Sequence, residues 1–260
     1  MQVTSIPSTI SAALVHAHPS WHPCLNAALA AMDKADPAYL PALANSHFLP
    51  TGQRLFAAFA LPLPAVRYVL VGEGPYPREA SATGVCFMDG AVGSLWCENG
   101  LSKPVNRATS LRNFIKMLLV ADGQLDLADT GAAAMAPLAQ RALRGGAVQT
   151  LAQVQERMLA HGFLLLNAAL VFRPEVAPAI DARGWRPFLQ TVLATLADYQ
   201  AATPPTLFLW GKIAEQLKAL PETARLPQVL AEHPYNLSFI GNAAMQALFG
   251  PMRLLGGQAE

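Results

Sequence analysis

The sequence predicts an α/β protein in which helices cover both faces of a parallel sheet. Short apolar runs alternate along the chain with segments whose apolar residues recur at helical spacing. A strand–helix–strand order requires crossover connections, which join parallel strands and place helices against the sheet. The chain has 260 residues, of which 53% are hydrophobic, so its length allows one α/β domain or two small ones.

The expected strands are four short apolar runs that follow a helical, proline-rich segment over residues 1–50. They are Arg67–Val71, Phe163–Leu166, Thr206–Leu209 and Gln228–Ala231. Each run is bounded by turn residues, as buried strands of a parallel sheet usually are.

Three helices between these strands have clear signals. Ser110 is a favourable N-cap for a helix that ends near Gly123. A second apolar stripe begins at Trp185, and we expect Pro187 in the first turn of that helix. A third helix is expected within residues 212–220.

Composition narrows the class of protein. The formal net charge is +1, from 18 basic and 17 acidic residues, which gives no global attraction to nucleic acid but leaves room for a local basic patch. Three cysteines without a CxxC pair or zinc-ligand spacing fit a reduced, cytosolic protein. The N-terminus lacks a signal-peptide pattern, and the longest apolar stretch is too short to cross a bilayer. We therefore expect a soluble cytoplasmic protein.

Four places are expected to form the site, because parallel sheets bind ligands at the carboxyl ends of their strands. They are residues 72–87, 167–173, 210–212 and 233–238. Asn167 follows an apolar run, so its buried carboxamide must either tie two loops together or face a ligand. His233 follows the fourth strand, which distinguishes it from the other histidines, although a loop histidine without function is the simpler interpretation.

Six segments, in this order along the chain, resemble motifs of the uracil-DNA glycosylases, most closely of the uracil-excising family. They are GEGPYP at 72–77 leading to GVCF at 84–87, SLRN at 110–113, LLLN at 164–167, RGW at 183–185, LWG at 209–211 and HPYNLS at 233–238. The resemblance implies one domain over residues 1–260, a three-layer sandwich with a central four-stranded parallel sheet flanked by helices. It also implies a monomer that acts on uracil-containing DNA in base excision repair, with water as co-substrate and no metal or organic cofactor.

The resemblance also implies a uracil pocket. Phe87 would stack on the flipped base, and the Asn167 carboxamide would bond its N3 and O4 edge. Tyr76 would reject the methyl group of thymine, and Gly72 belongs to the same pocket. His233 would donate a hydrogen bond to O2 as charge develops on the leaving base. Without the resemblance, the two aromatic residues would be expected in the core.

For the DNA itself, the resemblance implies a wedge and phosphate contacts. Leu237 would fill the gap left by the flipped nucleotide. Without the resemblance, this leucine would be expected to lie buried in the core. Ser110 and Ser238 would bind phosphates. Basic neighbours are expected to add local positive charge: Arg112, Lys116, Arg173 and Lys212.

The pattern departs from the family where water would be activated. Gly74 stands in place of the family's aspartate, and Pro77 in place of the following histidine. Tyr235 and Asn236 replace a serine and a proline. A glycine cannot orient or deprotonate water. The enzyme therefore works without that carboxylate, or a neighbouring acid substitutes, for which Glu73 is the preferred catalytic candidate.

Two further hypotheses remain open: an inactive relative that binds uracil-containing or damaged DNA, and a protein–protein module that keeps only the fold. The pocket residues Tyr76, Phe87, Asn167 and His233 favour a glycosylase with a non-standard arrangement for activating water.

Overall fold

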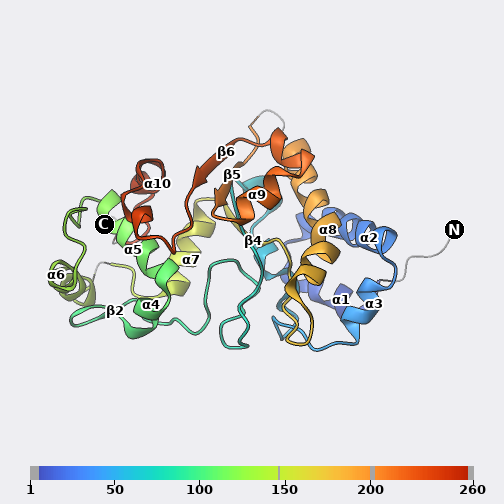
Figure 1. The fold of residues 1–260 in the computed structure, drawn as a ribbon, viewed down its shortest axis with the longest axis horizontal. Helices are drawn as coiled ribbons and strands as arrows, with labels where there is room; N and C mark the ends of the chain where they lie inside the picture. Colours follow the sequence, from blue (N-terminus) through green and yellow to red (C-terminus); the bar gives the residue numbers. More distant parts are fainter. Residues whose placement is uncertain (1–5, 146, 200–202, 257–260) are drawn as a thin grey trace. The chain divides into compact units, whose positions relative to one another are not determined.

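The computed structural model describes residues 6–145, 147–199 and 203–256. Contacts within the chain divide it into two compact units (Figure 1). Unit 1 comprises Met1–Asp89, Gly162–Leu209 and Ile213–Gln228. Unit 2 comprises Gly90–His161, Trp210–Lys212 and Val229–Glu260.

A four-stranded sheet forms in the order β4-β1-β5-β6. The strands are β1 (Tyr68–Gly72), β4 (Phe163–Asn167), β5 (Thr206–Trp210) and β6 (Gln228–Ala231). β1 pairs in parallel with both β4 and β5. Two backbone hydrogen bonds join β5 to the segment of β6: the N–H of Leu207 donates to the carbonyl of Pro227, and the N–H of Gly211 donates to the carbonyl of Ala231. The residue numbers rise together along the two strands, as parallel pairing requires. All four predicted strands are confirmed, as is the α/β class with a parallel sheet and flanking helices.

The strands of unit 1 are apolar on both faces. Alternate residues such as Val69, Leu164 and Leu207 belong to one core cluster with the neighbouring helices. The intervening residues Tyr68 and Phe163 stack on the other face, with ring centroids 4.7 Å apart. A sheet that is buried on both faces reads in sequence as continuous apolar runs, which is why the strands were recognisable.

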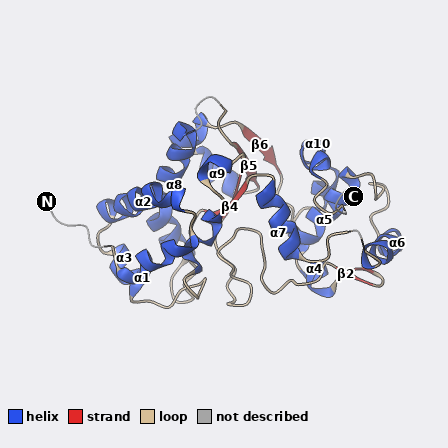
Figure 2. Ribbon diagram, turned by 180° about the vertical axis from the view of Figure 1, so that it is seen from behind, coloured by secondary structure: helices blue, strands red, loops and turns tan. Residues whose placement is uncertain are grey.

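The helices of unit 1 surround this core cluster. They are α1 (Ser8–Ala12), α2 (His22–Ala35), α3 (Tyr39–Ala44), α8 (Pro178–Tyr199) and α9 (Ile213–Lys218), with 3-10 turns at Ala13–His16, Pro19–Trp21, Arg54–Ala60, Leu63–Ala65 and Pro221–Arg225. α2 packs along α8 (Figure 1 and Figure 2). The helical N-terminal segment and the helix predicted within residues 212–220 are confirmed.

Unit 2 is mostly helical. It contains α4 (Lys103–Arg107), α5 (Thr109–Ala121), α6 (Ala132–Leu143), α7 (Leu151–Ala160), α10 (Ala243–Phe249), 3-10 turns at Leu237–Gly241 and Gly250–Met252, and a hairpin of β2 (Trp96–Cys97) and β3 (Gly100–Leu101). α5 packs against α4 and α10 (Figure 2). Thr150 and Gln153 form a reciprocal capping box that starts α7.

Two details of the helix predictions are wrong. Ser110 is not an N-cap, because α5 starts at Thr109 directly after α4, and Ala108 precedes it without a side-chain cap. Pro187 lies in the interior of α8 rather than in its first turn, because that helix already begins at Pro178. A proline at N1 suits a helix start, whereas the ring at 187 removes one helical hydrogen bond and crowds the carbonyl four residues before it.

A buried polar cluster ties α3, α8 and the segment after β4 together. The Tyr39 hydroxyl donates to Asp181 Oδ1 at 2.6 Å, and Arg173 Nη2 donates to the same oxygen at 2.6 Å. The guanidinium lies over the Tyr39 ring, 5.5 Å from its centroid. The hydrogen bond and charge of Asp181 raise the pKa of Arg173. Arg173 is 8% exposed, so the expectation that it adds surface charge for DNA is wrong.

Among the described residues, no helix combines the length and the apolar character that a bilayer crossing demands.

Replacing Gly184 by alanine tests the packing around this cluster. A Cβ at Gly184 would lie 2.4 Å from Cε2 of Tyr39, whose ring is held by Asp181. We expect overpacking to cost about 1–3 kcal/mol, which outweighs the roughly 1 kcal/mol that alanine gains over glycine in a helix. Chemical denaturation measures the free energy of unfolding.

Gly93→Ala is the matched control, because a Cβ there meets nothing within 4 Å. Equal unfolding free energies for the two variants would contradict the tight fit of α8 against Tyr39.

Candidate functional site

The carboxyl ends of β1 and β4 meet at Gly72 and Asn167, which are register partners. A Cβ at Gly72 would lie 2.6 Å from Cys86 Sγ and 3.2 Å from Asn167 Oδ1. Only a residue without a side chain therefore allows β1, Cys86 and the carboxamide to come this close.

Asn167 is 5% exposed, and its Oδ1 lies 3.2 Å from the position that a Cβ on Gly72 would take. Parallel sheets bind ligands at the carboxyl ends of their strands, which is where this amide stands. Of the two interpretations from the sequence, this geometry favours a ligand-facing amide over a structural tie.

Cys86 lies beneath this corner. Its N–H donates to the carbonyl of Leu165 at 3.0 Å, which ties the loop to β4. Burial raises the pKa of its thiol to about 12, against a smaller opposing effect of a hydrogen bond with the Gly72 backbone. The thiol is therefore neutral and serves as packing. Sequence reasoning gave it no role, although it stands inside the GVCF motif.

The two aromatic residues of the motif lie close to Cys86. Phe87 is half-buried and has a φ of 68°, a strained conformation for an aromatic residue that commonly marks functional sites. Tyr76 is 36% exposed, yet burial of its hydroxyl, with the charges of Cys86 and Asp89, raises its pKa to about 12. The structure thus gathers the four predicted uracil-binding residues within unit 1.

Glu73 faces a different space. With Gly74 it lines a cavity of about 410 Å³, whose wall includes Ala168, Arg173 and Asp181. The lining contains none of the four predicted uracil-binding residues.

In unit 2, a buried asparagine holds the segment that follows β6. Asn113 of α5 is 1% exposed, and its Nδ2 donates to the carbonyl of Pro234 at 2.8 Å. The same nitrogen lies 3.3 Å from the carbonyl oxygens of Tyr235 and Asn236. Sequence reasoning placed Asn113 in a motif without a role; its amide within the apolar stripe of α5 was the available signal.

The same turn sets the orientation of His233. Its Nδ1 accepts the N–H of Tyr235 at 3.0 Å, so a neutral imidazole carries its proton on Nε2. The glycine of the LWG segment makes room for it, because a Cβ at Gly211 would lie 2.7 Å from the Cβ of His233. His233 is exposed and presents a hydrogen-bond donor.

The predicted DNA-contacting residues also lie in unit 2. Leu237 is 69% exposed, which excludes the buried-leucine interpretation. Ser110 is half-buried in the first turn of α5, and Ser238 is exposed. Ser238 and Asn242 both hydrogen-bond the carboxylate of Glu232. Burial raises the pKa of Glu232, but these two bonds and the bond from its own backbone N–H outweigh burial, so the pKa of Glu232 is lowered.

Two of the predicted basic neighbours stand on α5. Lys116 Nζ donates to the carbonyl of Thr130 at 2.6 Å, and burial, followed by the charge of Arg112, lowers its pKa. Arg112 contacts Asn113 Oδ1 at 3.4 Å and the carbonyl of Asn106 at 3.3 Å.

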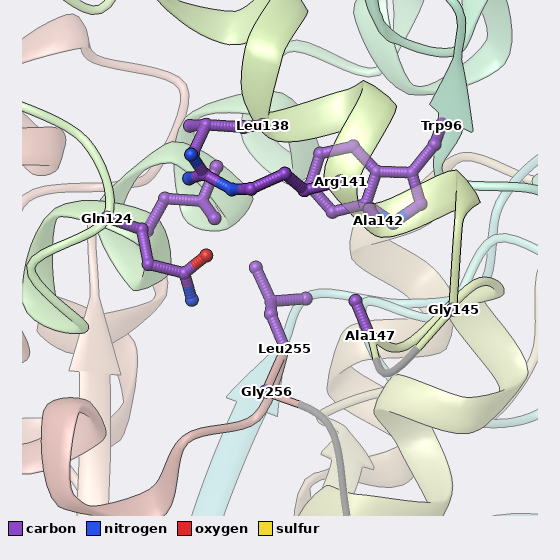
Figure 3. Close-up of a pocket in the computed structure, with 10 residues that line it drawn as sticks. Trp96, Gln124, Leu138, Arg141, Ala142, Gly145, Ala147, Leu255 and Gly256 are labelled. Atoms are coloured by element: carbon purple, nitrogen blue, oxygen red, sulfur yellow. The ribbon is translucent and has the colours of Figure 1, made fainter.

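A second cavity, of about 220 Å³, lies within unit 2 (Figure 3). Its walls come from the β2 hairpin, α5, α6 and the C-terminal segment, and include Trp96, Gln124, Arg141 and Leu255. No predicted site residue lines it. Within the described ranges, no three His, Cys, Asp or Glu side chains form a group able to hold a metal ion.

The fold and these strand-end residues define an α/β protein with a polar side chain, Asn167, at the carboxyl edge of its parallel sheet. No family model matches the chain. The uracil-DNA glycosylase of Corynebacterium glutamicum is 29% identical over 225 residues, covering 85% of this chain and 81% of that protein. Uracil-DNA glycosylase 2 of Streptomyces coelicolor is 29% identical over 197 residues, covering 75% and 70%.

Solved structures extend the comparison. The crystal structure of UNG from Nitratifractor salsuginis is 40% identical, with a TM-score of 0.87, and the match covers 96% of this chain and 98% of that one. Mimivirus uracil-DNA glycosylase, at 17% identity and a TM-score of 0.53 over 88% of this chain and 73% of that one, shares the fold. The chain belongs to the uracil-DNA glycosylase superfamily, and its relatives are uracil-DNA glycosylases.

Asn113→Ala tests how the 233–236 turn is held. The change leaves three carbonyl oxygens without the Nδ2 donor, for which we expect about 1–3 kcal/mol of lost stability. Unfolding in denaturant measures the loss of global stability. Limited proteolysis measures the loosening of the turn itself, which we expect to appear as faster cleavage near Tyr235.

The control is Asn45→Ala, which removes one exposed bond to the Pro41 carbonyl and should change stability by less than about 0.5 kcal/mol. An Asn113→Ala protein as stable and as protease-resistant as the control would refute the role of this amide.

Proposed function

We propose that the protein flips uracil out of DNA and excises it by hydrolysing the N-glycosidic bond. The observation that carries the proposal is the nearly buried Asn167 carboxamide, which lies against Gly72 at the carboxyl end of β4. Membership of the superfamily supports the same reaction. The substrate is uracil-containing DNA, on which the protein acts as a monomer in base excision repair.

Recognition of uracil follows from the pairing of donor and acceptor on one amide. The Asn167 Nδ2 would donate to O4 of uracil, and its Oδ1 would accept from N3–H. Cytosine presents an amino donor and an unprotonated N3 at these atoms, so both bonds would be lost. Phe87 would stack on the base. Tyr76, whose raised pKa keeps its phenol neutral, would occupy the space beside C5 that a thymine methyl needs.

Bond cleavage would depend on stabilising the departing base. As the bond between C1′ and N1 breaks, its electron pair moves to uracil, and negative charge accumulates at O2. His233 Nε2–H would donate to that oxygen, since Nδ1 is occupied as an acceptor. A water oxygen then bonds to the oxocarbenium carbon C1′ and releases a proton, leaving an abasic sugar and free uracil.

Activation of that water is the unusual part. Gly74 and Pro77 carry no group that accepts a proton. Glu73 is the nearest acid in the motif and lines one cavity with Gly74, the position of the family's aspartate, so Glu73 is the candidate base and attack without a carboxylate is the alternative. Loss of general-base assistance typically slows a reaction about 10²–10⁴-fold, so a slower glycosylase would remain active.

DNA would be held from unit 2. Leu237, which is 69% exposed, would fill the space left by a flipped nucleotide. Ser110 and Ser238 would contact phosphates, assisted by Arg112 and Lys212. Ser238 also hydrogen-bonds the carboxylate of Glu232, whose negative charge would oppose a phosphate there.

A single-turnover assay on a labelled uracil oligonucleotide tests the activity. We expect the wild type to form abasic sites and His233→Ala to lower the rate about 10²–10³-fold. His47→Ala, which changes an exposed histidine of unit 1, is the control. A rate that falls in Glu73→Gln would identify Glu73 as the base, whereas an unchanged rate supports attack without one.

Uracil-dependent binding without cleavage at stoichiometric protein would replace this proposal with an inactive DNA-binding relative, which the substitutions at Gly74 and Pro77 would then explain.

Restoring a carboxylate at position 74 tests the missing base directly. A Cβ at Gly74 would lie 3.6 Å from the carbonyl oxygen of Ala169, an ordinary contact, so the first atom of an aspartate side chain is accommodated there. We expect it to raise the single-turnover rate, by up to the roughly 10²-fold that a well-placed base provides. Gly74→Ala adds the Cβ without the charge. A Gly74→Asp rate no higher than that of Gly74→Ala would argue against water attack at this position.

A further inference from the structure

Two large side chains project into solvent from the turn after His233. Tyr235 is 67% exposed and Leu237 is 69% exposed, although each has a large apolar surface. Single exposed apolar residues are ordinary on protein surfaces, but two on one short turn mark an interaction site. Leu237 has a role in the proposed function, and Tyr235 has none.

The backbone that carries Tyr235 is fixed on both sides. Its N–H donates to His233 Nδ1 at 3.0 Å, and its carbonyl oxygen lies 3.3 Å from Asn113 Nδ2. The N–H of Asn236 donates to the carbonyl of His233 at 2.9 Å. Binding through the ring would therefore order only the tyrosine side chain, which has two soft torsions, so little entropy is lost.

We propose that Tyr235 stacks on an unpaired base next to the nucleotide served by His233, so that this ring adds to the binding of single-stranded DNA and not to the binding of a duplex. The inference rests on the proposed function. The serine that the family pattern has at this position offers no ring. The flat ring of a tyrosine can cover the face of any base while its hydroxyl stays in water, so stacking here does not depend on the DNA sequence.

The observations favour a single strand over a duplex. In a duplex, both faces of each neighbouring base are already stacked, except at the gap left by the flipped nucleotide, which Leu237 would fill. In a single strand, the next base has a free face within reach of a second ring. Arg112, which contacts the Asn113 amide that holds the turn, adds positive charge for the phosphates of that strand.

The test compares kcat/KM on a single-stranded uracil oligonucleotide with kcat/KM on the same strand paired in a duplex. Stacking on a base is worth about 1–3 kcal/mol, so Tyr235→Ser should lower the single-strand value about 5- to 150-fold and the duplex value less than about twofold. Tyr235→Phe should retain the wild-type preference. Tyr199→Ser, at an exposed tyrosine of unit 1, should change neither value.

Binding to a uracil-free single strand with 2-aminopurine separates this inference from the proposed function. Quenching of its fluorescence that is lost in Tyr235→Ser supports stacking even if the wild type excises no uracil. Excision by the wild type with unchanged binding and rates in Tyr235→Ser would overturn the stacking inference and leave the proposed function standing. An equal loss on both substrates would overturn it too, because Tyr235 would then act through the turn.

Discussion

The pairing of β1 with β4 is the constraint on which the arrangement of unit 1 depends. It brings Gly72 opposite Asn167 at the carboxyl edge, and the missing side chain of Gly72 lets Cys86 approach both. Glu73, directly after Gly72, lines a cavity together with Arg173 and Asp181, and none of the four predicted uracil-binding residues lines that cavity.

Two buried asparagines have opposite parts in this protein. Asn113 is satisfied, since its amide nitrogen lies within bonding distance of three successive carbonyl oxygens. Asn167 is 5% exposed and stands at the carboxyl end of β4 beside Gly72. The first amide stabilises a turn, whereas a role of the second in binding a base stays a proposal. Burial alone does not separate these two amides; their places in the fold do.

Much of the fold was predictable because buried parallel strands are continuous apolar runs with turn residues at their ends. The starts of the helices were harder to predict. Ser110 resembles an N-cap because the sequence does not show that α4 ends directly before α5. Pro187 resembles a first-turn proline because the sequence does not show that α8 already begins at Pro178. Arg173 was misplaced since its charge shows in the sequence, whereas its pairing with Asp181 exists only in the folded chain. Whether Glu73 or His233 acts on a substrate stays a prediction.

The bonds of Asn113 go only to main-chain oxygens of residues 234–236. Every amino acid has such an oxygen, so the path of this turn does not depend on which side chains it carries. The side chains at positions 235 and 236 can therefore differ without loss of these bonds, and the N–H of Tyr235 that holds His233 Nδ1 is likewise a main-chain group. A turn that is held by its backbone alone leaves its outward side chains free to vary.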